Sequence, residues 1–189
     1  MSEKIKDYID QFHDKDVFIP TKTIKLIGDV DDDMLNSALC NLHSLDYTAG
    51  EVTIKLVSDG GSVAVARAIY DLIVNMKNVV SIIAYGEVSS AASIILQAGD
   101  ERVMSPNSKL MLHAGEESIP SSHPKNSEKL YKQHRIDEAW MEDVYLSRIR
   151  EKKKRFTRVK LKELLEWDTF MNPKEALEYG LIDAIGEIQ

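Results

Sequence analysis

Hydrophobic residues recur over the first 113 residues in two alternating kinds of segment. One kind is a short apolar run, typical of a strand, and the other carries apolar residues three and four positions apart, typical of a helix. This alternation predicts a parallel α/β layer structure. The predicted strands lie at residues 23–27, 52–57, 79–85 and 109–113.

Residues 86–93 join two of the apolar runs and are rich in small side chains. The run before them, residues 79–85, is uncharged and rich in β-branched residues, and it predicts a fully buried strand. The run after them, residues 94–99, predicts a helix of about two turns. A sharp turn at the carboxyl end of a strand can present a nucleophile above a helix N-terminus. Ser90 is therefore a candidate nucleophile, although small residues here could serve close packing alone.

A second loop, Ser58-Asp59-Gly60-Gly61-Ser62, also follows a predicted strand and opens a predicted helix. Because the carboxyl ends of parallel strands meet at one edge of a sheet, its backbone amides can face the same crevice as Ser90. The loop could equally be an ordinary tight turn. It lacks both the Gly-Lys-Ser/Thr of a P-loop and the spacing of a dinucleotide-binding motif.

Two further side chains could complete a catalytic relay with Ser90. His113 is the only histidine that follows an apolar strand, and Asp168 lies between aromatic residues just ahead of a capped helix. In such a relay the imidazole removes the serine proton, and the carboxylate orients the imidazole and stabilises its charged form. Each residue alone could be structural, so the hypothesis requires that the three meet in space.

The second half of the chain has a different character. Residues 114–127 are rich in Gly, Ser, Pro and Glu and predict a loop, followed by a long helix from about residue 126 to 153. Residues 148–162 contain nine Lys or Arg, which suit either a solvated helix end or a patch for an acidic partner. Asn172 and Pro173 predict the start of a last helix that ends at Gly180. The apolar positions expected to pack along the long helix are Leu130, Ile136, Trp140, Val144 and Ile149.

Composition narrows the classes of function. The 189 residues favour one domain, and the net charge of −7 argues against bulk nucleic-acid binding. The single cysteine, Cys40, allows no internal disulfide and fits a reducing compartment. Residues 1–16 are polar, read as a short helix or arm, and carry no secretory signal pattern. Gly86 and Glu87 interrupt the apolar residues 79–98, which argues against a membrane span. Together with the net charge and the single cysteine, this leads us to expect a cytoplasmic protein without a membrane or nucleic-acid partner.

Several motifs, in matching order over roughly residues 20–186, resemble the family of proteolytic subunits of the Clp protease (ClpP). The family has a Ser-Pro-Gly-Gly-Ser-Val loop where this chain has residues 58–63, and an Ala-Ile-Tyr-Asp helix where it has residues 68–71. The family's nucleophilic serine stands four residues after a glycine, as Ser90 does after Gly86.

Two more motifs extend the resemblance to the C-terminus. The family's Pro-Asn-(Ser/Ala)-x-x-Met-x-His resembles residues 106–113, which end on His113. Its Asp-x-Phe, followed by Glu-Ala-x-Glu-Tyr-Gly-Leu-Ile-Asp, resembles residues 168–170 and 175–183. The linked order of the motifs is more specific than any one of them.

The resemblance implies a role for each candidate residue. Ser90 would be the nucleophile, His113 the general base and Asp168 the orienting carboxylate of a serine peptidase. The backbone N–H groups of Gly61 and Ala91 would form the oxyanion hole. The substrate-binding positions would be Gly60, Gly61 and Ala114, and no metal site is expected.

The resemblance also implies an architecture and an assembly. The fold would be an α/β domain of the ClpP/crotonase type, a β-β-α spiral with a protruding helical handle. An N-terminal arm at residues 1–20 would precede the peptidase domain at residues 21–189, with the handle at about 114–153. The chain would form homo-oligomeric, heptameric rings, with a stacked tetradecamer as an option. Polypeptide substrates would be fed by an AAA+ unfoldase, and ATP would belong to that partner, so no cofactor is expected in this chain.

Three alternatives stay open at this point. The chain could be a catalytically silent or activator-dependent ring subunit of the same fold. It could be a crotonase-type acyl-CoA enzyme, which shares the spiral and the oxyanion-hole logic without needing the Ser–His–Asp set. It could also be a binding module that uses the basic residues 148–162, with salt-sensitive binding to an acidic partner.

Overall fold

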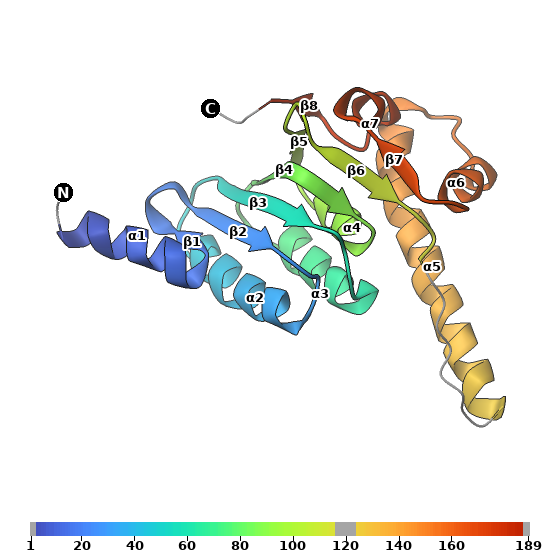
Figure 1. Ribbon diagram of the computed structural model, residues 1–189, viewed down its shortest axis with the longest axis horizontal. Coiled ribbons are helices and arrows are strands. Elements are labelled where there is room, and N and C mark those ends of the chain that lie inside the picture. The colour runs from blue at the N-terminus through green and yellow to red at the C-terminus, as the bar shows by residue number, and fades with distance from the viewer. Residues whose placement is uncertain (1–2, 116–123, 187–189) are drawn as a thin grey trace.

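A computed structural model describes residues 3–115 and 124–186, and Figure 1 shows their arrangement. Within these residues one eight-stranded sheet runs in the order β1-β2-β3-β4-β5-β8, while β6 pairs with β4 and β7 pairs with β6. Pairing is antiparallel at β1 and β7 and parallel elsewhere. The strands are β1 (Val17–Phe18), β2 (Thr23–Ile27), β3 (Val52–Ser58), β4 (Val80–Ser89), β5 (Glu101–Met104), β6 (Lys109–Leu112), β7 (Thr169–Met171) and β8 (Ala184–Ile185).

Helices cover the sheet and extend beyond it. In Figure 1, α2, α3 and α4 lie on one face of the sheet, while α1 lies beside β1 at one end and α5 projects away from the other end. A short 3-10 helix at Ile19–Thr21 links β1 to β2. The predicted α/β class and the predicted protruding helix are thus present. The helices are α1 (Glu3–Lys15), α2 (Asp32–Asp46), α3 (Val63–Val74), α4 (Ala91–Leu96), α5 (Pro124–Lys152), α6 (Arg158–Leu165) and α7 (Pro173–Tyr179).

The helix starts follow from polar caps that the sequence indicates. The Asp31 carboxylate accepts from the N–H groups of residues 33 and 34 at the start of α2. Asn172 and Glu175 form the predicted capping box of α7, and Gly180 ends that helix in the left-handed conformation. For α7, these local signals place the helix between Asn172 and Gly180, as predicted.

Strand β4 is longer than predicted and has two sets of neighbours. Residues 81–84 pair with β5, whereas residues 87–89 pair with β6. Gly86, with φ of 57°, separates the two halves. The expectation of a turn directly after residue 85 is therefore wrong: the chain stays extended to Ser89, and α4 begins at Ala91 rather than at residue 94. Val79 lies before the strand and is exposed, so the predicted run is not buried throughout.

The long helix differs from its prediction at its beginning. Helix α5 starts at Pro124, inside the predicted loop at 114–127, and the rest of that loop between 116 and 123 lies outside the described residues. Leu130 and Ile136, expected as packing positions, are exposed because this part of α5 projects beyond the sheet (Figure 1). Val144 and Ile149, nearer the body, are buried as expected.

An ion pair between a buried guanidinium and a partly exposed carboxylate joins the edge of the sheet to the C-terminal segment. The Arg102 side chain on β5 is 2% exposed, and its Nη2 lies 2.7 Å from Oδ1 of Asp183. Arg102 Nε donates to Oδ2 of the same carboxylate at 2.8 Å, which makes the pair bidentate. A buried guanidinium is tolerated here because the paired carboxylate and Gln97 satisfy its donors. Among the described helices, none is long and apolar enough to span a membrane.

Candidate active site

Ser90 stands at the junction between β4 and α4, in a conformation that few non-glycine residues adopt. Its φ and ψ are 53° and −125°. Hydrogen bonds hold the backbone on both sides: the Ser90 N–H donates to the Met111 carbonyl at 3.0 Å, and the Ser90 carbonyl accepts from the Ser93 N–H at 2.9 Å. The strain is therefore maintained by β6 on one side and by the first turn of α4 on the other.

Pairing of β6 with β4 places His113 beside Ser90. Ser89, the last residue of β4, is the register partner of Met111. His113, which directly follows β6, therefore lies next to the junction of β4 and α4. The Ser90 hydroxyl Oγ lies 2.7 Å from His113 Nε2. A serine hydroxyl and an imidazole at this distance form the nucleophile–base pair that acyl transfer requires.

Pairing of β7 with β6 brings Asp168 to the other side of the imidazole. Leu112 and Thr169 are register partners in this antiparallel pair, which places the preceding Asp168 opposite His113. His113 Nδ1 lies 3.1 Å from Asp168 Oδ1. The Asp168 side chain is 60% exposed, against 20% for His113. The structure thus brings together the three side chains that the sequence singled out.

The Gly60-Gly61 loop lies directly against Ser90. A Cβ added to Gly60 would lie 2.7 Å from the Ser90 Cβ and 2.8 Å from the Ser89 carbonyl oxygen, so only glycine fits. The loop is held by Val30, whose N–H donates to the Gly60 carbonyl at 2.8 Å. Positive φ values of 108° and 145° at the two glycines add to this requirement.

Two backbone donors next to Ser90, the N–H groups of Gly61 and Ala91, have no hydrogen-bond partner among the described residues. Ala91 is the first residue of α4, so its N–H has no partner within the helix. The neighbouring Val30 carbonyl accepts from the Ser62 N–H. The Gly61 N–H donates to no group among the described residues. Open N–H groups at a helix N-terminus can stabilise a developing oxyanion.

Ala114 lies one residue beyond His113 and lines a cavity of about 390 Å³. Its N–H donates to the Leu165 carbonyl at 2.9 Å. That donor is therefore not available to a bound peptide, whereas no described residue donates a hydrogen bond to the Ala114 carbonyl. Met141 and Leu165 give the cavity an apolar floor, and glutamates stand among its lining residues.

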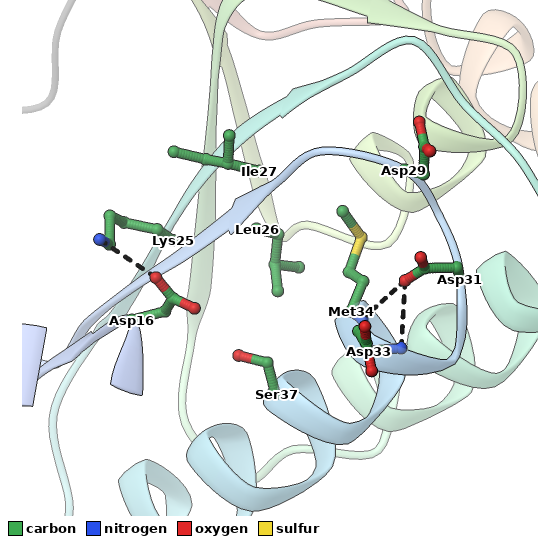
Figure 2. Close-up of a pocket in the computed structure, with 9 residues that line it drawn as sticks. All are labelled: Asp16, Lys25, Leu26, Ile27, Asp29, Asp31, Asp33, Met34 and Ser37. Carbon is green, nitrogen blue, oxygen red and sulfur yellow. Dashed lines mark hydrogen bonds and ion pairs between the residues drawn. The ribbon is translucent and has the colours of Figure 1, made fainter. Parts of the chain in front are cut away.

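Another pocket, of about 220 Å³, lies between β2 and the start of α2 and contains none of the predicted site residues (Figure 2). Two of its aspartates have local structural roles: Asp16 pairs with Lys25 at 3.1 Å, and Asp31 caps α2. No group of three or more metal-ligating side chains occurs in the part of the chain that the structure describes.

The basic residues at 148–162 are distributed over the end of α5, the following turn and α6. Many of them pair within the chain. Arg158 pairs with Glu142 at 2.6 Å and also with Asp143, and Lys153 pairs with Glu178 at 3.1 Å. This pairing supports the interpretation as a partly neutralised, solvated surface over the interpretation as a dedicated acidic-partner site.

Ser93 and Tyr145 were not predicted as site residues, although both lie close to Ser90. The Ser93 hydroxyl donates to the Ser90 carbonyl at 2.6 Å and lies 2.6 Å from the Tyr145 hydroxyl. Tyr145 comes from α5, more than fifty residues away in sequence. No spacing or motif in the sequence indicates this contact.

Comparison with known proteins places the chain among peptidases. The family model for Clp protease matches residues 9–189. The ATP-dependent Clp protease proteolytic subunit of Deinococcus radiodurans is 33% identical over 160 residues, covering 82% of this chain and 76% of that protein. The subunit of the same name from Ligilactobacillus salivarius is 30% identical, covering 87% and 82%. The chloroplastic proteolytic subunit 3 of Arabidopsis thaliana is 32% identical, covering 84% of this chain and half of that protein.

Proposed function

Because the chain belongs to the Clp protease family, and is by its relatives a Clp-type proteolytic subunit, we propose that it cleaves peptide bonds through Ser90, His113 and Asp168. The observation that carries this assignment is the continuous chain of contacts from Ser90 Oγ to His113 Nε2, at 2.7 Å, and from His113 Nδ1 to Asp168 Oδ1, at 3.1 Å. The reaction is a serine-dependent acyl transfer to water.

In the first step Ser90 Oγ attacks the carbonyl carbon of the scissile peptide, and His113 Nε2 takes the hydroxyl proton. The carbonyl π electrons move to oxygen, and a tetrahedral intermediate forms. Asp168 accepts the Nδ1–H of the imidazolium, which fixes the tautomer and stabilises the positive charge.

The negative charge on the tetrahedral oxygen needs donors beside Ser90. The N–H groups of Gly61 and Ala91 are the open backbone donors there, which supports their role as the oxyanion hole. The close approach of Gly60 to Ser90 supports a role for the glycine loop beside the reacting carbonyl. Losing one such donor typically costs about a hundredfold or more in kcat.

Collapse of the intermediate breaks the C–N bond, and His113 passes its proton to the leaving amine. The acyl group stays on Ser90 as an ester. Water then loses a proton to His113 and attacks the ester carbonyl, and the returned proton releases Ser90 and a free carboxylic acid. One water is consumed and one peptide bond is broken, with no change in the enzyme.

An extended substrate would align with the backbone of Gly60 and Gly61 and with the carbonyl of Ala114. We further propose a homo-oligomer of heptameric rings, with stacking into a tetradecamer, that receives unfolded polypeptides from an AAA+ ATPase. ATP would be hydrolysed by that partner, and no cofactor is assigned to this chain. A cytoplasmic location, the arm at residues 1–20 and the handle at about 114–153 stay predictions.

The proposal is tested by cleavage of a short fluorogenic peptide by wild-type protein and two serine variants. Ser90→Ala should lower kcat/KM by about a thousandfold or more, because it removes the nucleophile. Ser89→Ala is the matched control: Ser89 is the adjacent buried serine, and its hydroxyl donates to Glu87 rather than to His113. Unchanged activity in Ser90→Ala would contradict the assignment. Inactive but assembled wild-type protein would favour a silent or activator-dependent subunit.

A further inference from the structure

Helix α5 contacts both ends of the helix that carries Ser90 at its start. At the C-terminal end of α4, the Arg148 guanidinium donates to the carbonyls of Gln97, at 2.7 Å, and Gly99, at 3.0 Å. At the N-terminal end, the Tyr145 hydroxyl meets Ser93 at 2.6 Å. Because Tyr145 and Arg148 are three residues apart, they lie on one face of α5. Helix α4 is therefore held by polar contacts from a single neighbouring helix.

The direction of the hydrogen bonds at Ser93 follows from its one hydroxyl proton. That proton is donated to the Ser90 carbonyl at 2.6 Å, so Ser93 Oγ accepts from the Tyr145 hydroxyl. Burial raises the pKa of Tyr145 well above its usual range, so this side chain remains a donor at neutral pH. Tyr145 and Ser93 are each 1% exposed or less, so no water replaces either partner from the surface.

We propose that Tyr145 and Ser93 are positioning residues for Ser90, acting through its carbonyl group. The inference rests on the proposed function of Ser90 as the nucleophile. The Ser90 carbonyl accepts from both the Ser93 N–H and the Ser93 hydroxyl, and its peptide group also contains the Ala91 N–H. Rotation of that peptide group would therefore move the oxyanion donor and the nucleophile together. The Tyr145 hydroxyl fixes the Ser93 rotamer that prevents this rotation.

An ordinary hydrogen bond from a helical serine to the carbonyl three residues earlier would need no partner on another helix. Here Ser93 Oγ, besides donating to the Ser90 carbonyl, accepts from the buried hydroxyl of Tyr145, which links the turn at Ser90 to α5 across a sequence separation of 52. Because the link passes through the single Ser93 hydroxyl, the effects of Tyr145→Phe and Ser93→Ala on kcat should be coupled.

The test uses the full-length assembled protein and four variants: Tyr145→Phe, Ser93→Ala, the double variant, and Ser147→Ala as a matched control. Ser147 lies on α5 near Tyr145, but its hydroxyl donates to the Val144 carbonyl and not to α4. The measurements are kcat and KM for a fluorogenic peptide, Tm, and the Ser90 Oγ to His113 Nε2 distance in crystal structures of wild type and variants.

Tyr145→Phe should lower kcat about threefold and Ser93→Ala about tenfold, with KM changed less than about twofold. The double variant should match Ser93→Ala, because both changes break the same link. The variant crystal structures should show the distance from Ser90 Oγ to His113 Nε2 lengthened by about 0.3 Å from the 2.7 Å of wild type. Ser147→Ala should behave as wild type.

Two results would overturn the inference. One is a lower Tm with unchanged kcat and an unchanged Ser90–His113 distance, which would make the contact purely structural. The other is full additivity of the two single effects on kcat. Failure of the proposed function is seen separately, as absence of peptidase activity in wild type. In that case the crystallographic distance still decides whether Tyr145 and Ser93 position Ser90.

Discussion

The two ends of the contact chain through His113 differ in their surroundings. At the Ser90 end, every residue of α4 is buried and the Gly60 loop is in contact with the serine. At the Asp168 end, the carboxylate side chain is 60% exposed and its neighbour Trp167 is 77% exposed. The nucleophile is thus positioned by the core of the fold, whereas the carboxylate is positioned by the edge of a three-residue strand.

This difference has an electrostatic consequence. A charge interaction in contact with water is weakened by the high dielectric constant, and exposed ion pairs typically contribute less than about 1 kcal/mol. The contribution of Asp168 to catalysis should therefore be smaller than that of a buried relay carboxylate. Changes near Ser90 should alter activity and stability together, while changes at Asp168 should alter activity alone.

The largest of the following effects is expected for Gly60→Ala, at the buried end. The added methyl would meet the Ser90 Cβ at 2.7 Å and the Ser89 carbonyl at 2.8 Å, so the loop or the serine must move. A displacement of about 1 Å at a nucleophile can cost about a hundredfold in kcat/KM, and we expect a loss of that order together with a lower Tm.

Gly28→Ala is the control for this variant. Gly28 also has a positive φ, of 103°, but a Cβ there would contact nothing within 4 Å. It introduces backbone strain without the clash, so its Tm should fall while its kcat stays near wild type. Equal losses of activity in the two variants would show that the contact with Ser90 is unimportant.

Asp168→Asn tests the exposed end. We expect kcat/KM to fall about ten- to a hundredfold, less than the roughly ten-thousandfold cost of removing the charge of a buried relay aspartate. Tm should change little, since the side chain is in water. Glu166→Gln, in the same segment and also exposed, serves as the charge-matched control. A loss as large as that of Ser90→Ala would contradict the contrast drawn between the two ends.

The smallest effect on activity is expected for Asp183→Asn, which tests the sheet edge behind α4. Removing the Asp183 charge leaves the buried Arg102 guanidinium with Glu151, at 3.5 Å, as its remaining charged partner. We expect a cost of about 2 kcal/mol and a Tm lower by about 6 °C, with kcat of the folded protein near wild type. An unchanged Tm would show that the Arg102 pair does not support the buried end.

The same pair predicts the sign of a pH effect. Burial alone would raise the pKa of Asp183, but hydrogen bonds and the charge of Arg102 outweigh it and hold the pKa below its usual value. The stability from this group is therefore complete above the unfolded-state pKa of about 3.9 and is lost as the pH falls through the lower folded-state pKa. Tm of wild type should decline on acidification below about pH 4, with a smaller decline in Asp183→Asn.

Much of the fold around the site could be predicted because strong local signals determine it. The β-branched runs of β2 and β3 and the caps at Asp31 and Asn172 depend on neighbouring residues alone. Strands β1, β7 and β8 were missed because they have two or three residues, too few for a periodic pattern. Strand β5 was missed because two of its four residues, Glu101 and Arg102, are charged. From the sequence, Arg102 in β5 would be expected at the surface, because its distant partner Asp183 is known only from the structure.

Less of the site than of the fold could be predicted from the sequence. Ser90, His113 and Asp168 could be selected from their places after strands and from motif order, but their distances depend on the pairing of β6 with β4 and of β7 with β6. The extension of β4 beyond Gly86 was not predicted, since Glu87 and the serines interrupt its apolar run. The contact of Tyr145 with Ser93 could not be predicted, because Tyr145 stands among the apolar positions of a long helix and no motif marks it.

The most direct test of the account is the covalent labelling of assembled protein with a fluorophosphonate, followed by peptide mapping. The account predicts one adduct per chain, on Ser90, with none in Ser90→Ala and normal labelling in Ser89→Ala. An adduct on another serine, or no adduct on protein that hydrolyses peptides, would contradict the assignment of Ser90 as the nucleophile.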